Sequence, residues 1–197
     1  MARDGLTNQR VSVVAETYAR ALFELASEAG TAEVVRDQLL EIARLVDEND
    51  DLAALLAHRL LDPARRAASL RNLFEGQVED VLMRFLLVLN DKRRLEEIPG
   101  IAVSFDKRLK ESRGEVDVQV ITARPLSDEQ LAGVRDQISS AIGKTAIVHE
   151  TRDESLIGGL KIRIGDKLID ASVARQLRSL AHDLIEKSHS LASEVRA

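Results

Sequence analysis

The residues 110–131, KESRGEVDVQVITARPLSDEQL, mark the place where the periodicity of the chain changes from that of helices to that of strands. Valines at positions 116, 118 and 120 alternate with polar residues, and this spacing of two predicts a strand. Ser127 and Gln130 have the spacing of a capping box, so a helix is expected to begin directly after Ser127. We therefore predict a domain boundary near Glu111–Arg113, with a first domain of residues 1–111 and a second of residues 112–197.

Upstream of this stretch, apolar residues recur at spacings of three and four, which is typical of helices. Asp62-Pro63 is a clear start signal, because Asp is a preferred N-cap and Pro is favoured at the first helical position. Short connections between antiparallel helices favour a bundle. The six helices that we expect are roughly Val13–Ala29, Ala32–Glu48, Asp51–Arg59, Pro63–Phe74, Val78–Asn90, and a long one that begins near Arg94 or Pro99 and ends near Glu111.

Downstream of Ser127, the pattern predicts a small α/β unit. The helix after Ser127 should end at Gly143, and the Gly165-Asp166 pair suits a two-residue hairpin turn. A last amphipathic helix should begin after Asp170 or Ser172, and its apolar stripe would contain Val173, Leu177, Leu180 and Leu184. Strands are expected at Thr145–Glu150, Leu160–Ile164 and, more briefly, Lys167–Ile169. The predicted fold class is mainly α: an N-terminal six-helix bundle followed by a β-α-β-β-α domain. The short strand Lys167–Ile169 is an optional addition to this order.

The composition excludes several classes of function. The net charge of −5 argues against a nucleic-acid partner, and the 3% of aromatic residues leaves little material for stacking on bases or sugars. The chain has no Cys, so disulfides, iron–sulfur clusters and thiolate zinc sites are excluded. No apolar run approaches the ~20 residues that a bilayer requires, so no direct bilayer insertion is expected. The polar N-terminus resembles neither a signal peptide nor a transit peptide, which predicts a cytoplasmic chain.

Few residues have the context of catalytic or ligand-binding chemistry. The four histidines show no metal-binding spacing, and Gly158-Gly159 leads into a strand rather than into the helix that a phosphate-binding loop requires. We expect the glycine pair to form a bulge or a close backbone approach, and Asp153 and Ser155 to cap a loop. The basic run Lys92–Arg94 is interpreted as a solvated loop rather than an anion site.

Two helices are more apolar than a single core contact requires. At about 100° per residue, the apolar arc of the first helix spans roughly 200° and is rich in Ala, so another helix could approach it closely. The helix Val78–Asn90 is apolar almost all round, with Arg84 as its polar break. Such a helix is either central in the bundle or has a face that awaits a partner. Together the two helices suggest a groove that accepts an amphipathic helix.

Several motifs, in order along the chain, resemble the delta subunit of bacterial F-type ATP synthase, the family of the oligomycin-sensitivity-conferring protein. They are Tyr18–Ala26, Arg94-Leu95 with Ile98-Pro99, Arg113–Val116, Asp153–Gly159 and Ile164–Ser172. The resemblance implies a non-catalytic stator subunit without cofactor or metal, which links the catalytic head to the peripheral stalk so that proton-driven rotation is coupled to ATP synthesis. It implies a peripheral position on the cytoplasmic face of the bacterial cell membrane. The alternative is a helix-binding adaptor of an unrelated cytoplasmic complex.

The resemblance also implies where the partners bind. The N-terminal domain would hold an N-terminal helix of an alpha subunit of the head between its first and fifth helices, and the C-terminal domain would hold the C-terminal ends of the stalk's b subunits. The residues expected to contact the alpha-subunit helix are Tyr18, Ala21, Leu22, Leu82, Phe85, Leu86 and Leu89. The residues expected to form the structural motif of the second domain are Asp153, Ser155, Gly158, Gly159, Gly165, Asp166 and Asp170.

Overall fold

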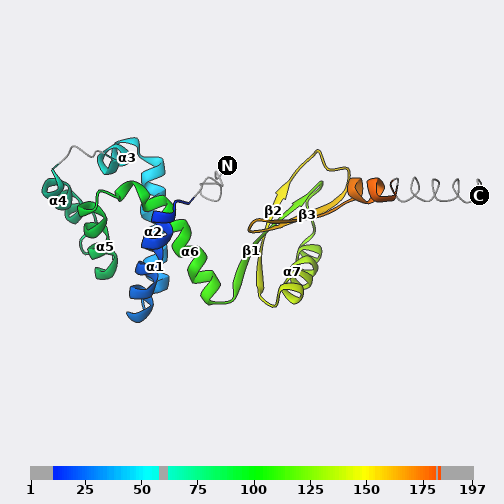
Figure 1. The fold of residues 1–197 in the computed structure, drawn as a ribbon, viewed down its shortest axis with the longest axis horizontal. Helices are drawn as coiled ribbons and strands as arrows, with labels where there is room; N and C mark the ends of the chain where they lie inside the picture. The colour runs from blue at the N-terminus through cyan, green and yellow to red at the C-terminus, as the bar shows by residue number, and fades with distance from the viewer. Residues whose placement is uncertain (1–10, 58–61, 181, 183–197) are drawn as a thin grey trace, which may run out of the picture. The chain divides into compact units, whose positions relative to one another are not determined.

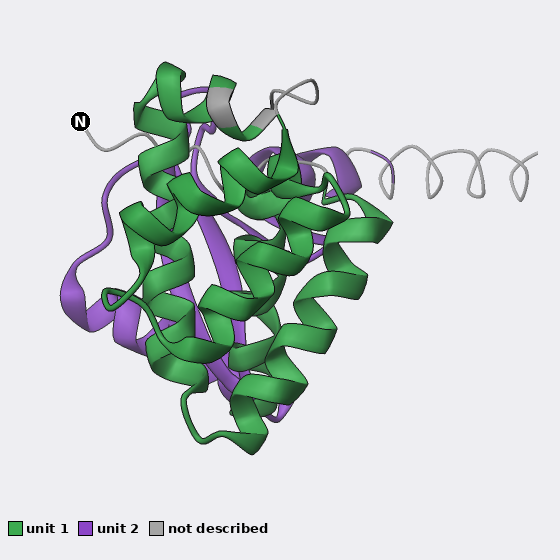
Figure 2. Cartoon of the chain, turned by 90° about the vertical axis from the view of Figure 1, so that its left-hand side faces the viewer, with its two compact units in different colours: residues 1–113 green, residues 114–197 purple. Residues whose placement is uncertain are grey.

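A computed structural model describes residues 11–57, 62–180 and 182 of the chain. It divides into two compact units, Met1–Arg113 and Gly114–Ala197, which Figure 2 distinguishes by colour. The division lies two residues beyond the boundary expected from the sequence. The predicted polar tail after Lys187 and two of the four histidines, His58 and His189, lie outside the described residues.

The first unit is helical throughout its regular structure (Figure 1). The predicted helices are confirmed, and their observed ends lie within a few residues of the expected ones. The end expected at Arg59 lies outside the described residues. The sequence left open where the last helix begins. The structure shows that a 3-10 turn comes first and that Pro99 lies in the first turn of the helix that follows. The elements are α1 (Val13–Glu28), α2 (Ala32–Glu48), α3 (Asp50–Ala57), α4 (Pro63–Phe74), α5 (Asp80–Asp91), η2 (Leu95–Glu97) and α6 (Ile98–Ser112).

Local signals place the starts of the helices. The Asp62 carboxylate accepts a hydrogen bond from the Ala64 amide at 3.3 Å, with Pro63 at the first helical position, so the predicted start of α4 is confirmed. Ser12 caps α1 by accepting from the Ala15 amide, and its hydroxyl donates to the Glu97 carboxylate at 2.6 Å. The second bond ties the beginning of α1 to the turn that precedes α6.

The small residues of α1 allow a close helix contact. Ala15, Ala19, Leu22 and Ala26 are fully buried. A Cβ atom built on Gly100 of α6 would lie 3.2 Å from the Ala15 Cβ, so there is no room for a larger side chain without a shift. Because Ser12 meets Glu97 and Ala15 meets Gly100, both helices begin at the same end of the unit and run in the same direction.

The second unit is a four-stranded sheet with one described helix on one of its faces (Figure 1). The strand order is β2-β1-β3-β4; β1 and β2 are parallel, and the other neighbouring pairs are antiparallel. The prediction of β-α-β-β-α is corrected in one respect, because the hairpin turn leads into a full strand rather than a brief addition. The elements are β1 (Glu115–Thr122), α7 (Asp128–Ile142), β2 (Thr145–Arg152), β3 (Gly159–Ile164) and β4 (Lys167–Ser172).

The caps of α7 are those that the sequence predicts. Ser127 and Gln130 form both bonds of the capping box, and Gly143 ends the helix in the left-handed conformation with φ 67°. Beneath α7, Val118 and Val120 are fully buried, and Ile138 and Ala146 pack against them. The alternation of the β1 valines thus gives this face of the sheet its core, as expected for a strand covered on one side.

The final helix is formed, but its apolar stripe is not covered. Residues 173–180 are helical, and the Ser172 hydroxyl accepts from the Arg175 amide at 3.3 Å, which identifies Ser172 as the cap. Val173 is half-buried, whereas Leu177 and Leu180 are 56% and 58% exposed. The predicted stripe is therefore largely exposed where the structure describes it, and Leu184 lies outside the described residues.

Candidate functional site: an apolar surface on α1 and α5

The first and fifth helices meet through one aromatic contact. The rings of Tyr18 and Phe85 pack edge to face, with centroids 6.2 Å apart and planes at 72°. This is a favourable geometry for an aromatic pair, and it fixes which side of each helix faces the other. Tyr18 is half-buried, so its ring covers the junction of the two helices while remaining partly open to solvent.

The structure buries most of the residues expected to contact a partner helix. Phe85 is 7% exposed, and the predicted leucines are fully buried: Leu22, Leu82, Leu86 and Leu89. They belong to the core of the first unit, where burial of large apolar side chains is the main source of stability. Tyr18 and Ala21 are the members of the predicted set that reach the surface. The others support that surface from beneath.

Four accessible apolar side chains of α1 form one line. Val14, Tyr18, Ala21 and Leu25 follow one another at spacings of four, three and four, so they lie along one side of the helix. Leu25 is 53% exposed, and Ala21 is exposed as well. Because Tyr18 contacts Phe85, this line lies on the side of α1 that borders α5.

A matching line runs along α5. Val81, Phe85 and Val88 are separated by four and three residues, and Val88 is 48% exposed. We call these residues, together with Val14, Tyr18, Ala21 and Leu25, the α1–α5 surface. Leu25 and Val88 are not among the contact residues expected from the sequence. The wide apolar arcs of the two helices include both residues, but the width of an arc does not tell which of its edges the core leaves exposed.

The two helices run in opposite directions. The Arg94 amide donates to the Leu89 carbonyl at 2.8 Å, so the chain turns back directly where α5 ends. Three residues later, Glu97 accepts from Ser12, which caps the beginning of α1. The carboxyl end of α5 and the amino end of α1 therefore lie at the same end of the surface, as the paths of the helices in Figure 1 indicate.

The motif of the second unit holds loops together. The Asp153 carboxylate accepts from the Ser155 hydroxyl at 2.6 Å and from the Ser155 amide at 2.9 Å, and these bonds lower the pKa of Asp153. Asp170 has a lowered pKa for the same reason, because it accepts hydrogen bonds from Ser172. The loop-capping interpretation of Asp153 and Ser155 is thus confirmed.

The paired glycines allow a close backbone approach. Gly159 has φ 76°, and a Cβ atom at this position would lie 2.5 Å from the Ala171 carbonyl oxygen. The neighbouring Gly158 carbonyl accepts from the Val173 amide at 3.0 Å. The predicted hairpin is also confirmed, since Ile164 pairs with Lys167 across Gly165-Asp166. Backbone packing accounts for Gly159, whereas a Cβ atom on Gly158 would lie 3.3 Å from a methyl carbon of Val173.

Chemical sites are sparse in the part of the chain that the structure describes. No group of three His, Cys, Asp or Glu residues there has the arrangement of a metal site. His149 Nε2 lies 2.7 Å from Asp117 Oδ1 on an exposed stretch of the sheet. No described helix is both long and apolar enough to cross a bilayer.

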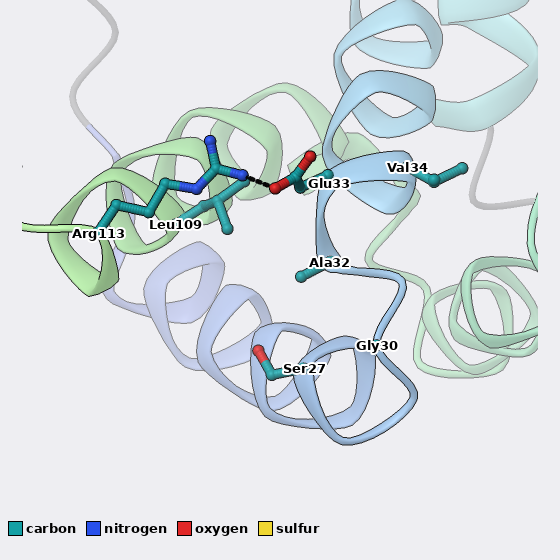
Figure 3. Close-up of a pocket in the computed structure, with 7 residues that line it drawn as sticks. All are labelled: Ser27, Gly30, Ala32, Glu33, Val34, Leu109 and Arg113. Carbon is teal, nitrogen blue, oxygen red and sulfur yellow. Dashed lines mark hydrogen bonds and ion pairs between the residues drawn. The ribbon is translucent and has the colours of Figure 1, made fainter.

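One pocket of the first unit has a volume of about 380 Å³ (Figure 3). Its polar feature is an ion pair between Arg113 and Glu33, whose charges already neutralise each other. Its lining includes neither His nor Cys, and its one carboxylate, that of Glu33, is held in the ion pair. Its lining consists of Ser27, Gly30, Ala32, Glu33, Val34, Leu109 and Arg113.

Comparison with known proteins supports one family throughout. The chain is 33% identical over 172 residues to the ATP synthase subunit delta of Symbiobacterium thermophilum, covering 87% of this chain and 92% of that one. It is 34% identical over 175 residues to the ATP synthase subunit delta of Agrobacterium fabrum, covering 88% and 93%.

A solved structure shares the fold. A chain of the Toxoplasma gondii mitochondrial ATP synthase hexamer matches with a TM-score of 0.65 at 20% identity, covering 88% of this chain and 98% of the other. The family model described as ATP synthase delta (OSCP) subunit matches residues 14–184, a range that covers most of each unit and the whole α1–α5 surface. The chain therefore belongs to the ATP synthase delta (OSCP) subunit family.

Proposed function

We propose that this chain is a non-catalytic stator subunit of an F-type ATP synthase, which joins the catalytic head to the peripheral stalk. The observation that carries the proposal is the family match over residues 14–184, together with an uncovered apolar surface on the first unit. In this role the protein holds the head against the torque of the rotor, so that proton-driven rotation is coupled to ATP synthesis. It works at the cytoplasmic face of the membrane as a peripheral part of the complex.

The first unit binds the amino-terminal helix of an alpha subunit on the α1–α5 surface. Half-exposed apolar side chains such as Leu25 and Val88 each gain about 1 kcal/mol when a partner covers them, since full burial of such a side chain contributes about 1.5–3 kcal/mol. The Tyr18–Phe85 pair supplies a rigid centre between them. A helix laid along two antiparallel helices buries side chains at several successive turns, and the resulting slow dissociation suits a stator.

The second unit binds the carboxyl-terminal ends of the b subunits. Its apolar side chains are exposed on β4, the last strand in the order of the sheet, and on the helical residues that follow it. Leu168 and Ile169 are each 52% exposed, and Leu177 and Leu180 are more than half exposed. Neighbouring residues of a strand point to opposite faces, so β4 offers an apolar contact on each side of the sheet edge.

Purification of the complex tests the proposal against an adaptor of another complex. The tagged chain, isolated from detergent-solubilised membranes of its own cell, should bring down alpha and b subunits in constant proportion. Recovery of a different set of proteins, with no head or stalk subunit, would refute the stator role. The isolated chain should also neither bind nor hydrolyse ATP, and saturable nucleotide binding at micromolar concentration would contradict its non-catalytic character.

A further inference from the structure

Two polar side chains occupy core positions where α4 meets α5. Arg66 lies on the buried side of α4 together with Leu70 and Phe74, and Asn90 follows Leu86 by four residues on a buried side of α5. Arg66 is 2% exposed and Asn90 is 0% exposed, and among the described side chains Arg66 is the one charged group that the fold buries. Burial of such groups costs free energy unless hydrogen bonds compensate for the lost water.

Hydrogen bonds join these two side chains into a network. Arg66 Nε donates to Asn90 Oδ1, and Arg66 Nη2 lies 3.4 Å from the Asn90 carbonyl oxygen. Asn90 Nδ2 donates to the carbonyl oxygen of Pro63, the first residue of α4, at 3.0 Å. Because Asn90 is in the last turn of α5, Arg66 also places its positive charge where carbonyl groups lack intrahelical partners. The network thus fixes the carboxyl end of α5 against the beginning of α4.

The apolar residues of α5 do not require this arrangement. Val88 is 48% exposed although Asn90 on the same helix is fully buried. Since successive residues are about 100° apart, rotation of α5 by about 60° about its axis would bury Val88 and move Asn90 to the half-buried side, where Leu87 now lies. Arg84 would become partly buried as well, but its long side chain can extend to solvent. Burial of apolar surface alone therefore favours the rotated helix, and the polar network opposes the rotation.

We infer that Arg66 and Asn90 are positioning residues, whose buried network sets the rotation of α5 about its axis and keeps Val88 at the surface. Rotation would separate the buried Arg66 guanidinium from the Asn90 oxygens, and a buried charge that loses a partner is strongly disfavoured. Apolar cores lose their unique arrangement before they lose stability, so a polar pair can specify one arrangement where apolar packing does not. The inference concerns the free protein, and its consequence for binding rests on the proposed function.

Thiol labelling of the free chain tests the rotation. The chain has no Cys, so Val88→Cys and Leu87→Cys each introduce a unique thiol, on the exposed and the half-buried side of α5. Each is combined with Arg66→Met/Asn90→Leu, in which apolar side chains of similar size replace the network. In this double variant the Val88→Cys thiol should react at least about tenfold more slowly and the Leu87→Cys thiol faster, because a buried thiol reacts only when the fold opens. Arg44→Met removes an exposed arginine and is the control, which should change neither rate.

A reciprocal change of the two labelling rates supports the inference. Unchanged rates would overturn it, and so would faster labelling at both positions, since that result indicates a loosened core. Stability gives an independent measurement: Asn90→Leu alone should lower the midpoint of urea unfolding, and the addition of Arg66→Met should restore it, because no charge is then left buried. A double variant less stable than the single variant would also overturn the inference, since the pair would then support the fold itself.

The affinity for the head tests the consequence for binding. In the proposed complex a partner covers Val88, so withdrawal of this side chain into the core should weaken binding about fivefold. Unchanged affinity together with reciprocal labelling would support the positioning role and count against the α1–α5 surface as the binding site.

Discussion

Replacing Ala21 by Asp should separate the binding of the head from the stability of the fold. Ala21 is exposed on α1 and lies between Tyr18 and Leu25 in the apolar line. In the free protein the new carboxylate stays in water. The fold therefore loses the difference in helix propensity, about 0.7 kcal/mol, and a few tenths more from the neighbouring Glu24.

In the proposed complex the same carboxylate would lie beneath the apolar face of the partner helix. A buried polar group without a partner costs about 1–3 kcal/mol, and more when it is charged. Since about 1.4 kcal/mol corresponds to a factor of ten in affinity, the dissociation constant should rise at least about tenfold. Binding is thus affected more strongly than folding.

Two further variants make the comparison sharp. Ala68→Asp places the same change at an exposed position of α4, so it should lower the melting temperature about as much as Ala21→Asp and leave binding intact. Leu22→Ala changes the adjacent, fully buried residue and should cost the fold about 2–5 kcal/mol. Calorimetric titration with the alpha-subunit peptide and thermal melts of all three variants provide the two measurements. If Ala21→Asp and Ala68→Asp bind equally well, the α1–α5 surface is not the binding site.

Three other predictions concern folding. A fragment of residues 1–113 should unfold cooperatively by itself, because the helical unit has its own core; a broad, non-cooperative melt in circular dichroism would contradict this. Gly159→Ala should destabilise the second unit far more than Gly165→Ala. Both residues have positive φ, but only at Gly159 would the new Cβ atom clash with the backbone, 2.5 Å from the Ala171 carbonyl oxygen. Equal midpoints of urea unfolding for the two variants would refute this. The pKa of Asp153 is lowered, so its bonds to Ser155 stabilise the fold fully above the ordinary carboxyl pKa of about 3.9, and this stabilisation is lost as the pH falls through the lower folded value. Asp153→Asn should therefore weaken the fold at neutral pH and make its stability less dependent on acid pH. An unchanged midpoint of acid unfolding would count against this capping role.

The sequence by itself determined the parts of the molecule that depend on local physics. The capping box of Ser127 and Gln130, the Asp62-Pro63 start of α4 and the hairpin turn at Gly165-Asp166 each involve residues within a few positions of one another, so no distant contact is needed to form them. The change from helical to strand periodicity similarly located the boundary of the two units to within two residues.

The tertiary structure decided which apolar residues the core covers. Leu22 and Leu25 are three residues apart on α1 and chemically identical, yet one is fully buried and the other is half exposed. Their difference depends on where α5 and α6 pack, and that contact joins residues far apart in the chain, such as Tyr18 with Phe85 and Phe23 with Phe105. The same holds for Leu177 and Leu180, whose spacing suits a buried stripe but which no described element covers. Hydrophobic periodicity predicts which face of a helix or strand is apolar. Only the packed structure shows whether the core of the fold covers that face or leaves it exposed to a partner.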